Sequence, residues 1–100
     1  MKAEWNYSEN DFQRFYDAKL DGHDLLVFEN RWQRGLWMGA VDGRVLLNKT
    51  KNDRIRRRHN LPKGASLQGY GFFLLGGKTP EYMMKKVEYC SKHGQTEISQ

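Results

Sequence analysis

The sequence has few of the residues that stabilise small secreted domains or bind metal ions. Its 100 residues include one cysteine, Cys90, which cannot form an internal disulfide bond. The three histidines are far apart, and no pair of histidine or cysteine residues has the spacing of a zinc site. We therefore expect no disulfide, no metal centre and no cofactor, and we expect Cys90 to be a small buried apolar residue.

Long apolar runs are also missing. The longest, Phe72 to Leu75, is far shorter than the ~20 residues that a membrane-spanning helix needs. The first ten residues are polar and contain no apolar segment of the kind found in signal peptides. Together with the single thiol, these features predict a cytoplasmic protein that does not bind membranes.

The apolar residues that are present are sufficient for a folded core. Hydrophobic residues make up 38% of the chain, and 13% of the residues are aromatic. A disordered chain has too little apolar area to offset the entropy lost on ordering, whereas a chain of this length buries roughly two-thirds of its surface. We predict one compact domain over residues 1–94 and a polar C-terminal tail over residues 95–100.

Charges of opposite sign are separated along the chain. Residues 1–30 carry three basic and seven acidic side chains, whereas residues 44–63 carry eight basic and one acidic. The net charge of the whole chain is +5. A dense positive region attracts polyanions and speeds their association, so the basic region is the first place to look for function.

Three patterns predict secondary structure in the first half of the chain. Residues 8–20 have the pattern of a helix, with Ser8 as its N-cap, apolar residues on one face and Gly22 after its last turn. Residues 23–29 are rich in residue types that favour strands. An Asp-Gly pair between two apolar runs predicts a β-hairpin over residues 36–48.

The second half contains the basic tract, a glycine-rich segment and a further helix. Residues 49–60 are compatible with either a short helix or an ordered loop. Alternating side chains between glycine bends predict a strand within residues 64–77. Thr79 as N-cap, Pro80 in the first turn and Gly94 after the end predict a C-terminal helix. The expected fold class is α+β, with a small antiparallel sheet of three to four strands, including the hairpin, flanked by an N-terminal and a C-terminal helix.

The basic tract over residues 49–63 is the strongest functional candidate. Clustered cations bind phosphates because each neutralised phosphate releases a counterion, and arginine also donates paired hydrogen bonds to phosphate and guanine. Trp32 lies between two arginines and can stack on a base. The expected binding residues are Lys49, Lys51, Arg54, Arg56, Arg57, Arg58, His59, Lys63 and Trp32.

These residues predict a small basic protein that binds single-stranded or structured RNA or DNA and is not an enzyme. A loop that carries the arginines suits single strands or structured RNA, whereas a helix could also enter the major groove of duplex DNA. The alternative is a protein-binding regulator, a small inhibitor or adaptor of a larger nucleic-acid-processing enzyme, since protein interfaces also favour tryptophan and arginine.

Two catalytic hypotheses have less support. A hydrolase could use His59 as an acid or base, but the sequence places no second catalytic group beside it. The segment from Gly76 to Thr79 is similar to the end of a nucleotide-binding phosphate loop, yet the first glycine of that motif is replaced by Phe72. At most, this segment and the helix that follows could hold a single phosphate.

Overall fold

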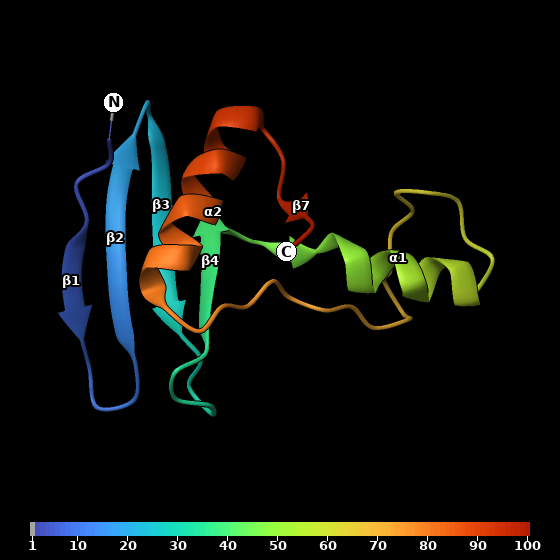
Figure 1. Ribbon diagram of the computed structural model, residues 1–100, viewed down its shortest axis with the longest axis horizontal. Helices are drawn as coiled ribbons and strands as arrows, with labels where there is room; N and C mark the ends of the chain where they lie inside the picture. The colour runs from blue at the N-terminus through green and yellow to red at the C-terminus, as the bar shows by residue number, and fades with distance from the viewer. Residues whose placement is uncertain (1) are drawn as a thin grey trace.

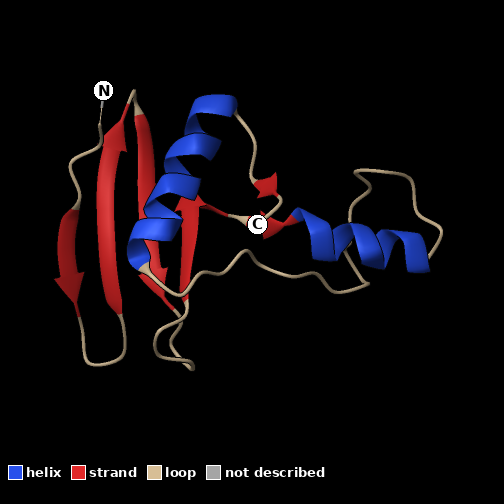
Figure 2. Ribbon diagram, viewed as in Figure 1, coloured by secondary structure: helices blue, strands red, loops and turns tan. Residues whose placement is uncertain are grey.

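The computed structural model describes residues 2–100 and shows an α+β fold in which one helix lies across an antiparallel sheet (Figures 1 and 2). Strands β1 to β5 form an antiparallel meander in chain order, and β6 pairs with β7 in a separate parallel pair. The elements are β1 (Asn6–Glu9), β2 (Arg14–Leu20), β3 (His23–Glu29), β4 (Trp37–Val41), β5 (Arg44–Val45), β6 (Leu47–Asn48), α1 (Lys49–Arg58), α2 (Pro80–His93) and β7 (Glu97–Ile98).

The N-terminal helix predicted over residues 8–20 is wrong, because this segment contains most of the β1–β2 hairpin. In β2, Tyr16, Ala18 and Leu20 are buried or half-buried, and the residues between them are exposed. This alternation with a period of two is the pattern of a strand with one buried face. Ser8 is not a helix cap, since Asn10 accepts the turn hydrogen bonds from the backbone N–H groups of the β1–β2 connection.

Gly22 ends no helix and instead forms a hairpin turn with Asp21. The φ angles of Asp21 and Gly22 are 51° and 81°, and those of Asp42 and Gly43 are 50° and 81°. Positive φ at both central residues is the requirement of a type I′ turn, which Asp-Gly pairs satisfy well. The hairpin predicted over residues 36–48 is therefore confirmed at β4 and β5, and the same signal at Asp21-Gly22 joins β2 to β3.

The glycine-rich strand predicted within residues 64–77 is also wrong. This segment is a long connection that makes only two isolated bridges within the described residues, from Leu74 to Leu47 and from Gly77 to Trp37. Its glycines introduce bends that prevent a continuous ladder. The main sheet is completed instead by β1 and β2, so it has five strands rather than three or four.

The C-terminal helix is confirmed as α2. The Thr79 side chain accepts a hydrogen bond from the Tyr82 backbone N–H at 3.1 Å, and Gly94 ends the helix in the left-handed conformation with φ 64°. Residues 95–100, predicted as a polar tail, contain β7, and the Ile98 side chain is buried in the core. Its apolar side chain and the pairing with β6 explain why this end is ordered.

The core lies between α2 and one face of the main sheet. Met83, Val87 and Cys90 form a buried stripe on α2, and they belong to one cluster with Leu25 and Trp37 of the sheet. α2 approaches β4 closely at Gly39, where an added Cβ atom would collide with Val87. Glycine at this position therefore sets the distance between helix and sheet.

The opposite face of the sheet has no helix over it (Figure 2). Phe15, Phe28 and Met38 lie in register on three adjacent strands, and Leu26 lies beside them. All four side chains are half-buried, so this face retains partly exposed apolar surface.

A second unit extends away from the sheet (Figure 1). We call residues 48–73 the arm: it contains α1 and the connection that returns from α1 toward the sheet. The chain leaves β5, passes through β6 and enters α1, whose far end points away from the sheet. The arm accounts for the elongated shape of the molecule, which measures 42 × 31 × 19 Å.

The close approach at Gly39 can be tested by a double-mutant cycle. We expect Gly39→Ala to reduce the free energy of unfolding by about 2 kcal/mol, because the new methyl group overpacks the helix–sheet contact. Val87→Ala removes the side-chain atoms with which that methyl group collides. In urea denaturation, the double variant should therefore lose about 1 kcal/mol less than the sum of the single variants, and strict additivity would contradict this packing.

Candidate nucleic-acid interface

Helix α1 is formed by the basic tract, which resolves the choice between helix and loop. Asn48, at the end of β6, accepts a hydrogen bond from the Lys51 backbone N–H at 3.1 Å and caps the helix. The helix ends at His59, before Pro62, whose ring disfavours helical geometry in the preceding residue. The small β6–β7 pair thus fixes where the basic helix begins.

The helix has a buried face and an exposed cationic face. Asn52, Ile55 and Arg56 are buried against the rest of the protein. The exposed cations recur at helical spacing, so they share the outer side of α1. We call them the outer face of α1, and they are Lys51, Arg54, Arg57 and Arg58.

Across residues 2–100, none of these four side chains forms an ion pair with a carboxylate. Lys51 lies over the Phe73 ring, with its Nζ atom 5.3 Å from the ring centroid. The guanidinium groups are therefore available to an external anion. Such groups can bind phosphate without first giving up an internal partner.

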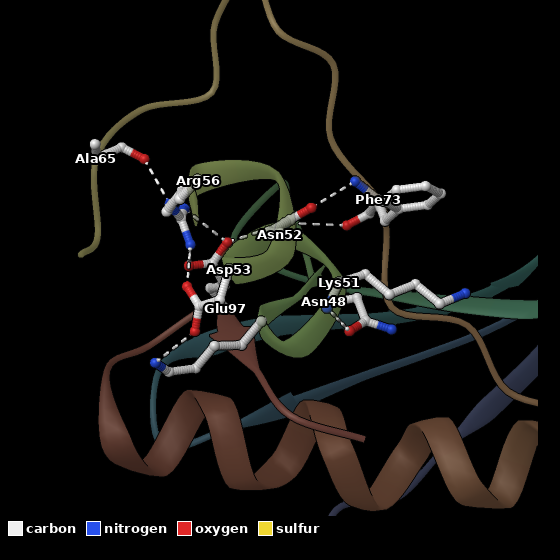
Figure 3. Close-up of polar contacts among 9 residues, drawn as sticks. Asn48, Lys51, Asn52, Asp53, Arg56, Ala65, Phe73 and Glu97 are labelled. Atoms are coloured by element: carbon white, nitrogen blue, oxygen red, sulfur yellow. Dashed lines mark hydrogen bonds and ion pairs between the residues drawn. The ribbon is translucent and has the colours of Figure 1, made fainter. Parts of the chain in front are cut away.

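Arg56 differs from its neighbours because it is only 6% exposed and each of its three side-chain nitrogen atoms contacts an acceptor of the protein (Figure 3). Its Nε atom donates to the carbonyl of Ala65 at 2.8 Å, and Nη1 donates to the carboxylate of Asp53 at 2.8 Å. Nη1 and Nη2 also contact the Glu97 carboxylate at 2.9 and 3.0 Å. The structure therefore places Arg56 in the attachment of the arm and not on the outer face with Arg54, Arg57 and Arg58.

Asn52 is a second part of this attachment that sequence reasoning missed. Its side chain accepts from the Phe73 backbone N–H at 2.7 Å and donates to the Phe73 carbonyl at 3.3 Å (Figure 3). It also donates to the Glu97 carboxylate at 3.0 Å. The sequence contains one signal for this role: Asn52 and Arg56 are four residues apart and must share a face if the tract is helical.

Lys49 is turned toward α2 and away from the outer face. Its Nζ atom lies 3.4 Å from the Asp53 carboxylate. The pKa of Asp53 is lowered mainly by the hydrogen bond from Arg56 and to a smaller extent by the one from Lys49. Lys49 also lines a groove of about 580 Å³ beside α2, together with Lys85 and Lys86. These two lysines were not among the predicted binding residues, and they add positive charge to this side of the molecule.

Aromatic side chains accompany the cations of the arm. The His59 and Tyr70 rings lie 4.7 Å apart between centroids, and both side chains are exposed. Phe72 and Phe73 are also exposed, on the connection that packs beside α1. Lys63 is exposed on the same connection. The arm therefore combines free cations with flat ring surfaces, which is the composition of many nucleic-acid interfaces.

Trp32 is not part of the arm. It lies in the β3–β4 connection, at one end of the main sheet, and its side chain is 79% exposed. Nearby, the buried Glu29 carboxylate accepts hydrogen bonds from Arg14 at 2.7 and 3.0 Å and from the Gly35 backbone N–H at 3.0 Å. The hydrogen bonds from Arg14, which has the larger effect, and from Gly35 lower the pKa of Glu29 to about 2. The connection is therefore held by an ionised carboxylate.

Neither metal ligation nor a bilayer span is indicated by the described part of the chain. Residues 2–100 contain no group of three histidine, cysteine, aspartate or glutamate side chains placed to hold a metal ion. In the same range, neither helix has the length and apolar composition that crossing a bilayer requires.

Comparisons with known proteins identify no relative. No protein-family model matches the chain, and no curated protein or solved structure shows a significant match to it.

The different roles of neighbouring arginines can be tested by stability. We expect Arg56→Ala to reduce the free energy of unfolding by about 3 kcal/mol, since the Asp53 and Glu97 carboxylates both lose their arginine partner. Arg57→Ala, on the exposed face, is the matched control and should change it by less than about 0.5 kcal/mol. Urea denaturation measures both changes, and equal effects of the two substitutions would contradict the division of α1 into two faces.

The Glu29 ion pair predicts an acid-sensitive contribution to stability. The folded pKa of about 2 lies below the usual 4.5, so the ionised carboxylate contributes fully above pH 4.5. This contribution decreases as the pH falls from 4.5 to about 2. Glu29→Gln should therefore flatten the pH dependence of the unfolding free energy in this interval.

Asp17→Asn provides the control, because Asp17 is an exposed carboxylate on the adjacent strand and has no ion-pair partner among residues 2–100. Its acid dependence should resemble that of the unmodified protein. A Glu29→Gln variant with unchanged acid dependence would show that the pair does not stabilise the folded state.

Proposed function

We propose that this protein binds nucleic acid through the outer face of α1. The observation that carries the proposal is the division of α1 itself. Arg56 is neutralised and buried, whereas the four cations of the outer face have no carboxylate partner among residues 2–100. A surface that keeps its positive charges apart from the acidic residues of the same chain favours an anionic ligand.

Phosphate is the anion that this surface suits best. Arg54, Arg57 and Arg58 recur at positions i, i+3 and i+4, so their guanidinium groups follow one side of the helix. Each can donate two hydrogen bonds to a phosphate, and each phosphate neutralised releases counterions. A polymer of phosphates gains these contributions several times over, whereas a single small anion gains one.

The anchoring of the arm supports the same function. Asn52 and Arg56 hold α1 against Glu97 and the returning connection through contacts that lie within the protein. The helix therefore does not need to order when it binds, which reduces the entropic cost of association. In this proposal, His59 acts with Tyr70 as a ring surface and not as a catalytic acid or base, and the protein is a binding protein rather than an enzyme.

A second candidate is a protein-binding regulator, as an inhibitor or adaptor of a nucleic-acid-processing enzyme. The open face of the main sheet favours it, because Phe15, Phe28 and Met38 form a partly exposed apolar row. This function would be supported by a protein partner that remains bound after nuclease treatment. Phe28→Asp should abolish that binding, whereas substitution of the outer face of α1 should not.

The nucleic-acid proposal is tested by combining Arg54→Ala, Arg57→Ala and Arg58→Ala. Binding of labelled single-stranded RNA, single-stranded DNA and duplex DNA can be followed by fluorescence anisotropy over about 50 to 300 mM salt. We expect the triple variant to bind at least about 100-fold more weakly, and the slope of log K against log salt to fall by about 2 for a single strand.

The matched control removes three charges elsewhere, through Arg44→Ala, Lys78→Ala and Lys92→Ala. These side chains are exposed and lie outside α1. The control should retain most of the affinity because it changes the net charge equally but leaves the outer face intact. Equal losses in the two triple variants would mean that only net charge matters, and unchanged affinity of the α1 variant would overturn the proposal.

A further inference from the structure

Two connections at one end of the main sheet share a local structure. Residues 10–13 join β1 to β2, and residues 30–36 join β3 to β4, so both lie at the same end of the meander (Figure 1). The Asn10 side chain accepts from the backbone N–H groups of residues 12 and 13 at 2.8 Å each. The Asn30 side chain accepts from those of residues 32 and 33 at 2.8 and 2.9 Å.

Each of these turns presents an aromatic side chain two residues after its asparagine. Phe12 is 58% exposed and Trp32 is 79% exposed. The Arg31 guanidinium lies against both, with its Cζ atom 4.6 Å from the Phe12 ring centroid and 4.7 Å from the Trp32 ring centroid. We call these three residues the Phe12–Arg31–Trp32 cluster.

The backbone beneath this cluster is fixed from several directions. The Gln13 side chain donates to the Glu29 carbonyl at 2.8 Å, which ties the first turn to the start of the second connection. The buried Glu29 carboxylate accepts from Arg14 and from the Gly35 N–H, and the Asn30 N–H donates to the Leu36 carbonyl at 2.7 Å. The exposed rings therefore stand on a preorganised base, which favours binding because less entropy is lost.

The chemistry of the cluster fits a flat ring that carries hydrogen-bond acceptors. The indole and phenyl rings offer π surfaces, and the guanidinium edge offers N–H donors. Arg34 is exposed on the same connection and adds positive charge beside them. A nucleotide matches this set, since the face of its base stacks on aromatic and guanidinium groups, the edge of the base accepts hydrogen bonds and its phosphate is anionic.

We propose that the Phe12–Arg31–Trp32 cluster is a base-stacking contact for single-stranded nucleic acid, separate from the outer face of α1. This inference rests on the proposed function and specifies its ligand. In a duplex the faces of the bases are stacked on one another, so a surface that binds by stacking selects unpaired bases. α1 then contacts phosphates, and the cluster contacts bases at another part of the molecule.

The test compares Trp32→Ala with Trp32→Phe on three ligands at one salt concentration. The ligands are a single-stranded DNA of about 16 nucleotides, an abasic strand of the same length and charge, and a duplex of the same sequence. We expect Trp32→Ala to bind the single strand about 10-fold more weakly, with the abasic strand and the duplex changed by less than about two-fold. Trp32→Phe should recover most of the lost affinity, because phenylalanine also stacks on a base.

Tryptophan fluorescence gives an independent readout. Stacking on Trp32 should quench its emission on addition of the single strand but not of the abasic strand, and Trp32→Phe should abolish that quenching. Trp37 is buried in the core and provides an internal reference. This signal reports contact with the base even where the change in affinity is small.

The outcomes separate this inference from the proposed function. Loss of binding in the α1 triple variant, with Trp32→Ala binding all ligands normally, overturns the stacking contact and leaves the proposed function intact. If the α1 triple variant binds the single strand with normal affinity and Trp32 emission is still quenched, the stacking contact is supported and the role of α1 in binding is overturned. Equal weakening for the abasic strand and the intact single strand, or preferred binding of the duplex, also overturns the stacking contact. No binding of any ligand by the unmodified protein overturns both.

Discussion

The carboxylate of Glu97 joins three parts of the chain that are far apart in sequence. It lies on β7 near the C-terminus, and it receives hydrogen bonds from Asn52 and Arg56 on α1 (Figure 3). Arg56 in turn donates to the carbonyl of Ala65 on the returning connection. Because β7 also pairs with β6, which leads directly into α1, this network determines both where the arm begins and how it is held.

The network also determines which cations are available for binding. An arginine that is buried between two carboxylates has its charge compensated there and is not exposed to an external ligand. Arg56 has this environment, whereas Arg54, Arg57 and Arg58 are exposed and form no ion pair with a carboxylate among residues 2–100. The four arginines within residues 54–58 therefore differ in environment, because each environment depends on the side of α1 on which the residue lies.

A comparable arrangement is found at the end of the main sheet. The ion pair of the buried Glu29 with Arg14 fixes the connection from which Arg31 and Trp32 project, and Arg31 is not part of that pair. In both places an internal ion pair stabilises the backbone, and a nearby arginine has no carboxylate partner among residues 2–100. The two surfaces differ in composition: α1 offers mainly charge, and the Phe12–Arg31–Trp32 cluster offers mainly ring faces. In the proposed function, a single-stranded polymer contacts both surfaces, because it has both phosphates and exposed bases.

Short-range signals in the sequence were sufficient for the elements that depend on local geometry. Asp42-Gly43 predicts its hairpin because that pair readily adopts positive φ, and Thr79, Pro80 and Gly94 predict the limits of α2 because capping is local. Residues 14–20 were predicted wrongly as helix, because their apolar residues satisfy both a helical and an alternating pattern. Pairing with β3 decides between the two patterns, and Asp21-Gly22 forms the turn between these strands with the same local signal as Asp42-Gly43.

The sequence by itself determined the fold class, the C-terminal helix, the hairpin at residues 36–48 and the position of the basic tract. Only the tertiary structure decided that Arg56 is buried and that Trp32 lies apart from α1. It also decided that Arg31 lies against both Phe12 and Trp32. Charge and local turns are properties of neighbouring residues and can be read along the chain. Burial and stacking depend on which distant segments pack together, and in this protein Glu97 and Glu29 supply those long-range contacts.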